Sequence, residues 1–391
     1  MTTAIGRLNS VGRQYPIGDI VGVRLPIALL LALPMFAPVL LPSTKLLSLA
    51  VTCAIYVIVA NGLHVVFSYA GQLSLAQSTL WGVGAYAAAL LIIHQGWPTP
   101  VLLPAAGMFG AAAAIGIGIP AFRTAGFSFA IITFAFGEIL RLIGNNWTDL
   151  TRGSTGLTVF DEPTALGSIR FDTFDNLSNF YLLCLAFAYL SLLGVLLVRQ
   201  SSLGRTFITI RENEALARSL GVNVYVNKLI AFGISGFFAG VAGVLFVYHQ
   251  KHIDPGPLSP FGAFFTIQFL LMILIGGRFS MLGPTIGAVV VVFGPELANF
   301  VVDRLLGSFF DLTFNRVQIF FGMTLAISVL TAPHGIAGQT RDGYNAFVLV
   351  GRHYRERGRG VLVSTLIGLA FAFWPRAAQR RGINIRPEGS N

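Results

Sequence analysis

The chain has 391 residues, of which 54% are hydrophobic and only 11% are charged. Soluble globular domains carry about a quarter charged residues, and the mean hydropathy here is +0.74. These values exclude an ordinary soluble domain, a disordered chain and a disulfide scaffold, and they indicate a polytopic membrane protein. The formal net charge of +10 is expected from basic cytoplasmic loops, so no nucleic-acid partner is predicted.

Ten stretches are long and apolar enough to cross a bilayer as helices, which requires about 20 mostly apolar residues. Unpaired backbone groups are too costly in lipid for irregular segments, and the runs are continuous rather than alternating. The sequence therefore predicts an all-α, polytopic transmembrane helical bundle. The ten predicted spans are 25–41, 46–67, 78–94, 101–122, 125–143, 179–198, 229–248, 261–276, 284–303 and 317–332.

The distribution of arginine and lysine predicts the orientation. Arg7, Arg13 and Arg24 precede the first span, which places the N-terminus inside by the positive-inside rule, and ten spans return the C-terminus to the cytoplasm. Most basic residues of the later connecting segments then fall on the inner side. The predicted outer loop 144–178 is acidic instead.

Three regions follow from these spans: a cytoplasmic segment 1–24, a transmembrane domain 25–338 and a basic tail 339–391. The first span contains three prolines, and a signal sequence is the alternative there. The apolar stretch 361–374 is short, and we expect an interfacial helix that lies on membrane lipid rather than a further crossing.

The longest inner loop, 199–228, joins the sixth and seventh spans. Its middle, from Arg205 to Leu220, has the pattern of a short amphipathic helix pair, and Gly221 fits a helix stop. A small charged helix beneath the membrane suits docking into a cleft of a soluble partner. A solvated connector is the alternative.

A polar stretch from Ser68 to Ser78 interrupts two apolar runs. Such a break at membrane depth is tolerated where it is buried in protein or lines a cavity, and broken helices often form substrate sites. A tight cytoplasmic turn is the alternative. With other polar side chains inside the spans, this stretch supplies the candidates for a substrate path: Asn61, Gly71, Gln72, Ser74, Gln77, Thr133 and Glu138.

Glu138 has a second interpretation, because Arg141 lies one turn later on the same helix face and forms a structural ion pair with it in that case. Glu296, in the ninth span, has no partner nearby in the sequence. His249 and His252 are spaced to share a helix face and are interpreted as a hydrated interfacial pair rather than a metal site. No metal site is predicted.

Small residues recur at four-residue spacing in the fourth and seventh predicted spans. They are Ala106, Gly110, Ala114 and Gly118, then Gly236, Ala239, Gly240 and Gly243. A flat helix face made of small side chains permits close helix packing. We therefore expect these two helices to pack in the core, with a subunit interface as the alternative.

Several motifs resemble one protein family. Loop 199–228, with Gly204-Arg205 and Glu214-Ala215-Leu216-Ala217 followed by Gly221, resembles the coupling loop of ABC importer permeases. The candidate residues for coupling to an ATPase are Gly204, Arg205, Arg211, Glu212, Glu214, Ala215, Ala217 and Gly221. The stretches 71–77 and 82–86 (GQLSLAQ and GVGAY), 129–139 (FAIITFAFGEI) and 332–338 (APHGIAG) are similar to branched-chain amino acid permeases of the LivM type. The resemblance covers about residues 46–340, departs at Ala76, where glycine is common, and does not extend into the basic tail.

This resemblance implies a permease subunit in the inner membrane of a bacterium, with two ATPase subunits, a second permease and an extracytoplasmic solute-binding protein. No lysine follows a glycine, so the chain has no P-loop and ATP would be used by the partner subunits, with no cofactor bound by this chain. It is not expected to be an enzyme. The expected cargo is a branched-chain or related amino acid. A permease for urea or a short amide is one alternative, and an ion-coupled secondary transporter is another.

Overall fold

The computed structural model describes Pro34, Pro38 and residues 43–124, 126–160, 177–256, 259 and 261–305, with side chains only up to residue 297 in the last range. The predicted segment 1–24, the tenth span and the tail with its stretch 361–374 lie outside the described residues, as does the first span except for its two described prolines.

The described chain is almost entirely helical, and each of the eight predicted spans between residues 46 and 303 lies on a helix. The long helices are α4 (Thr44–His64), α5 (Gln77–Gln95), α6 (Thr99–Ala121), α7 (Phe127–Asn146), α9 (Leu177–Gln200), α12 (Val224–Gln250), α13 (Ala263–Gly276) and α14 (Gly283–Leu305). Five of them are long and apolar enough to cross a membrane: α4 with its extension to Tyr69, α6, α7, α9 and α12.

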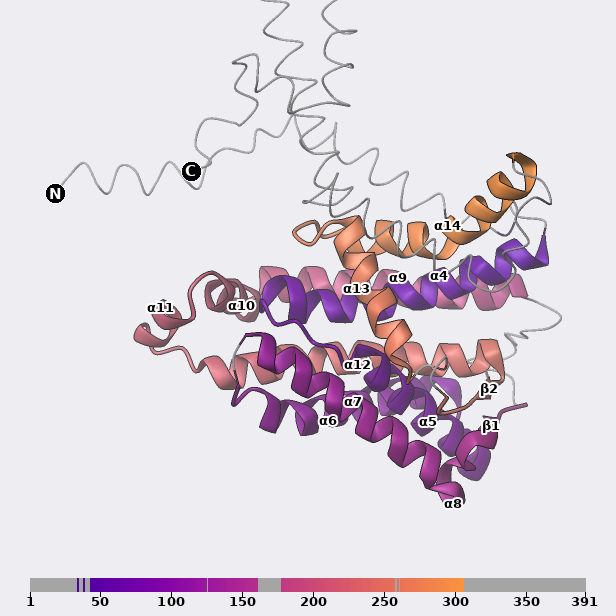
Figure 1. Cartoon of the computed structure of the whole chain (residues 1–391), viewed down its shortest axis with the longest axis horizontal. Coiled ribbons are helices and arrows are strands. Elements are labelled where there is room, and N and C mark those ends of the chain that lie inside the picture. The colour runs from indigo at the N-terminus through magenta and orange to yellow at the C-terminus, as the bar shows by residue number, and fades with distance from the viewer. Residues whose placement is uncertain are drawn as a thin grey trace, which may run out of the picture.

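Shorter elements connect these helices (Figure 1). A π-helix, η2 (Val65–Tyr69), continues α4, and a short pair, α10 (Ser202–Glu212) and α11 (Glu214–Ser219), precedes α12. After α7 come α8 (Thr148–Thr151), the 3-10 turn η3 (Gly153–Thr155) and β1 (Leu157–Thr158). Strand β1 pairs antiparallel with β2 (His252–Ile253), Leu157 opposite Ile253.

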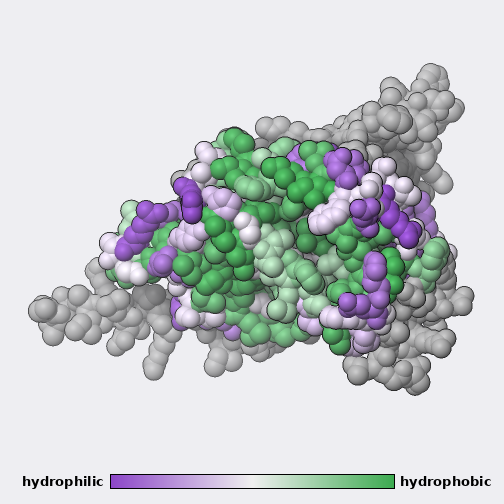
Figure 2. Space-filling view, turned by 90° about the horizontal axis from the view of Figure 1, so that it is seen from below, coloured by the Kyte–Doolittle hydropathy of each residue, from purple (hydrophilic) through white to green (hydrophobic). Residues whose placement is uncertain are grey.

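The surface pattern matches a helical bundle that spans a membrane. Figure 2 shows hydrophobic residues across the middle of one face and hydrophilic residues gathered toward both ends. Large exposed apolar side chains on α6 and α7 contribute to such a surface, among them Met108, Phe109, Phe127 and Ile131. Only 28% of the apolar window of α7 is buried within the chain, against 78% for α4 and for α12.

Helix α12 lies at the centre of the bundle and packs against α4, α5 and α6. The predicted close packing of the fourth and seventh spans is confirmed. A Cβ on Gly236 would overlap the carbonyl oxygen of Gly110, and one on Gly240 would overlap that of Ala106. Because the two backbones touch, a larger side chain at these positions would force the helices apart.

An aromatic cluster fills the space between α4, α5, α12 and α13. The Trp81 ring is fully buried and meets Tyr56, Phe246, Phe265 and Phe269 at centroid distances of 4.4–5.9 Å. All four pairs are edge-to-face, an arrangement that aromatic quadrupoles favour. The cluster fixes how the four helices pack around the start of α5. Cys53 and Cys184 are both buried and free.

Segments predicted on the same side of the membrane meet at the same end of the bundle. At one end Tyr225, at the start of α12, donates a hydrogen bond to the Ile119 carbonyl of α6. At the opposite end the hydroxyls of Thr99 and Tyr248 lie 3.1 Å apart, near the β1–β2 pair.

The prediction that His249 and His252 share a helix face is wrong. Helix α12 ends at Gln250, Lys251 takes a left-handed conformation, and His252 belongs to β2. The His249 ring lies 3.3 Å from the Ser48 hydroxyl of α4, whereas the His252 ring meets Thr158 of β1. The chain reversal at Lys251 therefore directs the two rings to different partners.

Candidate functional site

The polar stretch after η2 runs back into the bundle instead of forming a tight turn. Gln77, at the start of α5, donates through its amide nitrogen to the Val59 carbonyl at 3.3 Å. Val59 lies ten residues before the end of η2 at Tyr69, which corresponds to about 15 Å along a helix. Helix α5 therefore begins deep within the bundle, and residues 70–76 form an irregular connection alongside α4 (Figure 1). The geometry favours the buried break over the tight turn.

Three further helices supply hydrogen bonds to this break. The Thr133 hydroxyl of α7 accepts from the Leu75 backbone N–H at 3.1 Å, and the Thr266 hydroxyl of α13 accepts from that of Ser78 at 3.1 Å. The Ser235 hydroxyl of α12 donates to the Gln77 side-chain oxygen at 2.8 Å. The predicted candidates Ser74, Gln77 and Thr133 are thus brought together, and all three are fully buried.

A second set of buried polar side chains continues along α4. Asn61 donates to the Ser191 hydroxyl of α9 at 3.0 Å. Its side-chain oxygen, both ring nitrogens of His64 and the Ser68 hydroxyl have no hydrogen-bond partner among the described residues. Buried polar atoms are normally paired, so this line of groups along α4 calls for a ligand, water or a conformational role.

Glu138 is not part of the buried break. Its carboxylate accepts hydrogen bonds from Arg141, with the Arg141 Nε at 2.9 Å, and its side chain is 40% exposed. Arg141 also donates to the Pro255 carbonyl beyond β2. The structural interpretation of the Glu138–Arg141 pair is therefore the one that the geometry supports.

Loop 199–228 forms the predicted helix pair, α10 and α11, which lies beyond the ends of the long helices (Figure 1). A side-chain cap marks the start of α10, of α11 and of α12. Ser201 accepts from the Gly204 N–H, Asn213 from the Leu216 N–H and Asn223 from the Val226 N–H. Serine and asparagine are preferred at these positions because they pair otherwise unsatisfied N–H groups. These caps could have been recognised in the sequence from the spacing of Ser201, Asn213 and Asn223.

Glycine residues set the path of this loop. A Cβ on Gly204 would overlap the Val198 carbonyl oxygen of α9, so α10 turns tightly against the preceding helix. Gly221 has φ +81° and follows the last turn of α11, where Val222 N–H donates to the Ala217 carbonyl. The predicted helix stop at Gly221 is confirmed, because this left-handed conformation favours glycine.

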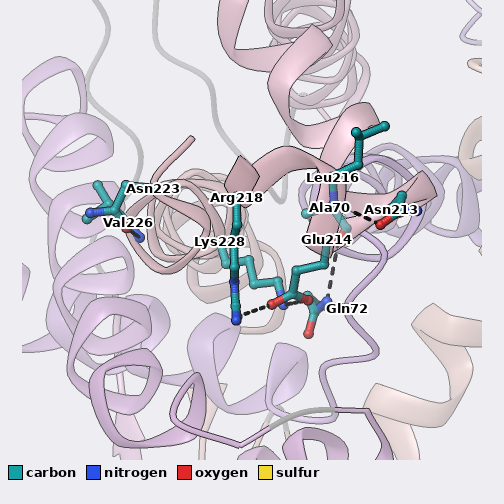
Figure 3. A network of polar contacts seen from close by, with 9 residues as sticks. All are labelled: Ala70, Gln72, Asn213, Glu214, Leu216, Arg218, Asn223, Val226 and Lys228. Carbon is teal, nitrogen blue, oxygen red and sulfur yellow. Dashed lines mark hydrogen bonds and ion pairs between the residues drawn. The ribbon is translucent and has the colours of Figure 1, made fainter. Parts of the chain in front are cut away.

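Glu214 ties α11 to α12 (Figure 3). Its carboxylate accepts from Arg218 at 2.6 Å and from Lys228 at 2.7 Å, and the Lys228 side chain is only 7% exposed. Partial burial by itself raises the pKa of the Glu214 carboxyl, but the Lys228 hydrogen bond and the two nearby cations outweigh burial, so that its pKa is below the ordinary value. The Glu214–Lys228 ion pair holds α11 against α12 of the membrane domain.

The outer face of the helix pair combines apolar and polar groups. Leu216 is 53% exposed and Leu220 is 70% exposed. Arg205, Glu212 and Ala215 are exposed as well, whereas Ala217 is buried. An apolar side chain that is free on a short charged helix is available for contact with another protein.

The candidate coupling residues of loop 199–228 and the candidate substrate-path residues of the break meet at Arg211. Its guanidinium donates to the Ser68 carbonyl at 2.6 Å, and a Cβ on Gly71 would lie 2.7 Å from the Arg211 Cγ. Gln72, next to Gly71, is only partly buried and donates weakly to the Ala70 carbonyl at 3.5 Å. Arg278 and Phe279 also lie at this junction but are not among the predicted site residues. Their place beside Arg211 is seen only in the tertiary structure.

A multi-pass helical membrane protein with a polar break inside its bundle and a charged helix pair at one end belongs to the class of membrane transport proteins. Residues 45–332 match the family described as "Branched-chain amino acid transport system / permease component". The chain belongs to this family, and it is a transport permease rather than an enzyme.

Individual relatives agree with the family match. The chain is 32% identical to the high-affinity branched-chain amino acid transport system permease protein LivM of Salmonella typhimurium, over 75% of this chain and 70% of that protein. It is 30% identical to LivM of Escherichia coli, over 83% of this chain and 77% of that protein. The permease protein LivH of Salmonella typhimurium is 24% identical, over 73% of this chain and 91% of its own length. No solved structure matches the chain significantly.

Proposed function

We propose that this chain is the membrane-spanning permease subunit of an ABC importer, and that it forms part of the path by which branched-chain or related amino acids enter the cell. The observation that carries the proposal is the match to the permease family over residues 45–332. The names of the LivM relatives, which are 30–32% identical to this chain, support the substrate class.

The proposal includes the assembly and the topology. The chain lies in the bacterial inner membrane with about ten spans and both termini in the cytoplasm. Its partners are a second, homologous permease, two ATPase subunits and an extracytoplasmic solute-binding protein. ATP is bound and hydrolysed by the ATPase subunits, and this chain carries no cofactor.

Loop 199–228 is the surface on which an ATPase subunit docks. Three features support this role: the exposed Leu216 and Leu220, the Glu214 ion pairs that hold α11 on α12, and the tight turn at Gly204. Gly204, Arg205, Glu212 and Ala215 shape or line the docking face, while Ala217 and Gly221 fix its geometry. Closure of the ATPases moves this loop, and the helices attached to it then rock to alternate the access of the path.

The buried break contributes to the path. Ser74, Gln77 and Thr133 are buried at the depth where α5 begins, and Asn61 has an unpaired carbonyl oxygen among the described residues. The positive end of the helix dipole at the start of a broken helix favours a carboxylate, a group that every amino acid carries. Gly71 and Gln72 lie at the cytoplasmic end of the break. Glu138 has a structural role through its ion pair with Arg141.

The test is transport by the complete assembly in vesicles. The chain is reconstituted with two ATPase subunits, a second permease and a solute-binding protein, and uptake of labelled leucine is measured with and without ATP. We expect leucine uptake to require ATP and every partner. Unlabelled isoleucine or valine should compete with this uptake. Uptake by this chain alone, driven by an ion gradient, would refute the proposal, and competition by urea or acetamide but by no amino acid would refute the substrate class.

A further inference from the structure

Arg211, in the last turn of α10, connects the coupling loop (199–228) to the polar break between η2 and α5. Its Nη1 donates to the Ser68 carbonyl at 2.6 Å, and its side chain is 20% exposed. The aliphatic part of the side chain lies against Gly71, whose φ of +72° and missing side chain leave room for it. An arginine from the loop thus occupies the point where the helix becomes irregular.

The carbonyls at this point lack their usual helical partners. Ala70 N–H bonds to the Val65 carbonyl and Gln72 N–H to that of Val66, after which the chain leaves the helix. Arg211 takes the Ser68 carbonyl, and Arg278, from the α13–α14 turn, approaches the Phe67 carbonyl at 3.5 Å. Cations at the negative end of a helix are stabilising, and they satisfy carbonyls that have no N–H partner.

The ring of Phe279 joins the two arginines. It lies 5.2 Å from the Arg211 guanidinium carbon and 5.4 Å from that of Arg278, and Arg278 also stacks on Phe67 at 4.4 Å. We call this set the arginine clamp: Arg211, Arg278, Phe279 and the carbonyls of Phe67 and Ser68.

The clamp holds two like charges close together. Burial, and next the charge of Arg211, lower the pKa of Arg278, and the Arg278 Nε has no hydrogen-bond partner among the described residues. Glu212 pairs with Arg211 and compensates part of the repulsion. An arrangement of this kind depends on the exact position of α10, because a small shift of the loop removes the Ser68 hydrogen bond and leaves that carbonyl unpaired.

We propose that Arg211 is the positioning residue that transmits movement of the coupling loop to the broken helix, by holding the Ser68 carbonyl at the end of η2. The inference rests on the proposed function, since it requires a loop that an ATPase moves. A shift of α10 draws η2 and residues 70–76 with it; this segment contains Ser74 and leads directly to Gln77 at the start of α5. π-Helical turns are rare and concentrate at functional sites, which fits an element that changes its register.

The experiment compares leucine uptake and ATP hydrolysis in the complete reconstituted transporter. In Arg211→Gln we expect the amount of leucine transported per ATP to fall about tenfold, the factor that the loss of one charge-assisted hydrogen bond implies, while ATP hydrolysis continues. Arg211→Lys keeps a cation but not the forked guanidinium, and partial rescue is expected. Arg123→Gln makes the same charge change at an exposed position of the same end of the bundle and serves as the control.

A second variant tests the contact without a change of charge. Gly71→Ala places a methyl group against the Arg211 Cγ, so it should also lower the transport per ATP, and its effect should not add to that of Arg211→Gln. Unchanged transport per ATP in Arg211→Gln would overturn the clamp and leave the proposed function intact. Loss of assembly in that variant alone would also overturn it, since the arginine would then serve folding. Failure of the unmodified assembly to transport leucine would overturn the proposed function itself.

Discussion

Replacement of Gly236 by alanine tests the packing of α12 against α6. The new Cβ would overlap the Gly110 carbonyl oxygen and lie 2.6 Å from the Ala114 Cβ, whereas carbon atoms in contact are about 3.5–4.0 Å apart. The two helices must therefore separate by about 1 Å, and overpacking of this kind costs about 1–3 kcal/mol. Alanine also favours a helix over glycine by about 1 kcal/mol, which offsets part of the loss.

Gly116→Ala is the matched control on α6. It gains the same helix propensity, but its Cβ would meet nothing within 4 Å. The difference between the two variants therefore isolates the packing cost of about 1–3 kcal/mol. Cys53 and Cys184 are both buried and are the only cysteines, so a dye that reacts with exposed thiols reports thermal unfolding in detergent. Gly236→Ala should unfold several degrees below Gly116→Ala, and equal unfolding temperatures would refute the close-packing argument.

Three further predictions concern the coupling loop. Glu214→Gln removes the charge that faces Lys228, and it should lower leucine uptake per ATP while the protein remains in the membrane; full coupling in this variant would contradict the role of the ion pair. Gly221→Ala imposes a side chain on a left-handed residue and should cost about 1–2 kcal/mol, seen as faster amide exchange in α11, whereas unchanged exchange would contradict it. The depressed pKa of Glu214 means that its stabilisation is present above the pKa of the unfolded chain and is lost as the pH falls through the folded value. Exchange in α11, corrected for the intrinsic rate, should therefore rise on acidification below the ordinary range of glutamate, and this rise should be absent in Glu214→Gln.

The membrane class, the helical stretches and the helix pair of the loop are all predictable because they depend on local sequence. An apolar run of helical length has few structures available in lipid, and small residues four apart mark a face for close packing. Gly110 and Gly236 were predicted to lie at such faces, and their backbones do touch. The i,i+3 spacing of Glu138 and Arg141 likewise predicts their ion pair, which forms within one helix turn.

Contacts between distant segments were not predictable in this way. Glu296 has no partner nearby in the sequence, yet its carboxylate lies 2.9 Å from the Lys45 ammonium, 251 positions away. The sequence also left open whether the stretch 68–78 is a surface turn, because its glycines and polar residues suit both structures. The Gln77 hydrogen bond to Val59 decides for a buried break.

The sequence by itself determined that this protein is a helical membrane permease with a charged loop at one end, since hydrophobic length, charge asymmetry and family motifs are properties of the linear chain. Only the tertiary structure decided that the loop and the break are in contact. Arg211 and Ser68 are 143 positions apart, and no periodicity relates them. Their contact depends on how α9, α10 and α12 pack around α4, and that packing results from side-chain shapes along many helices at once.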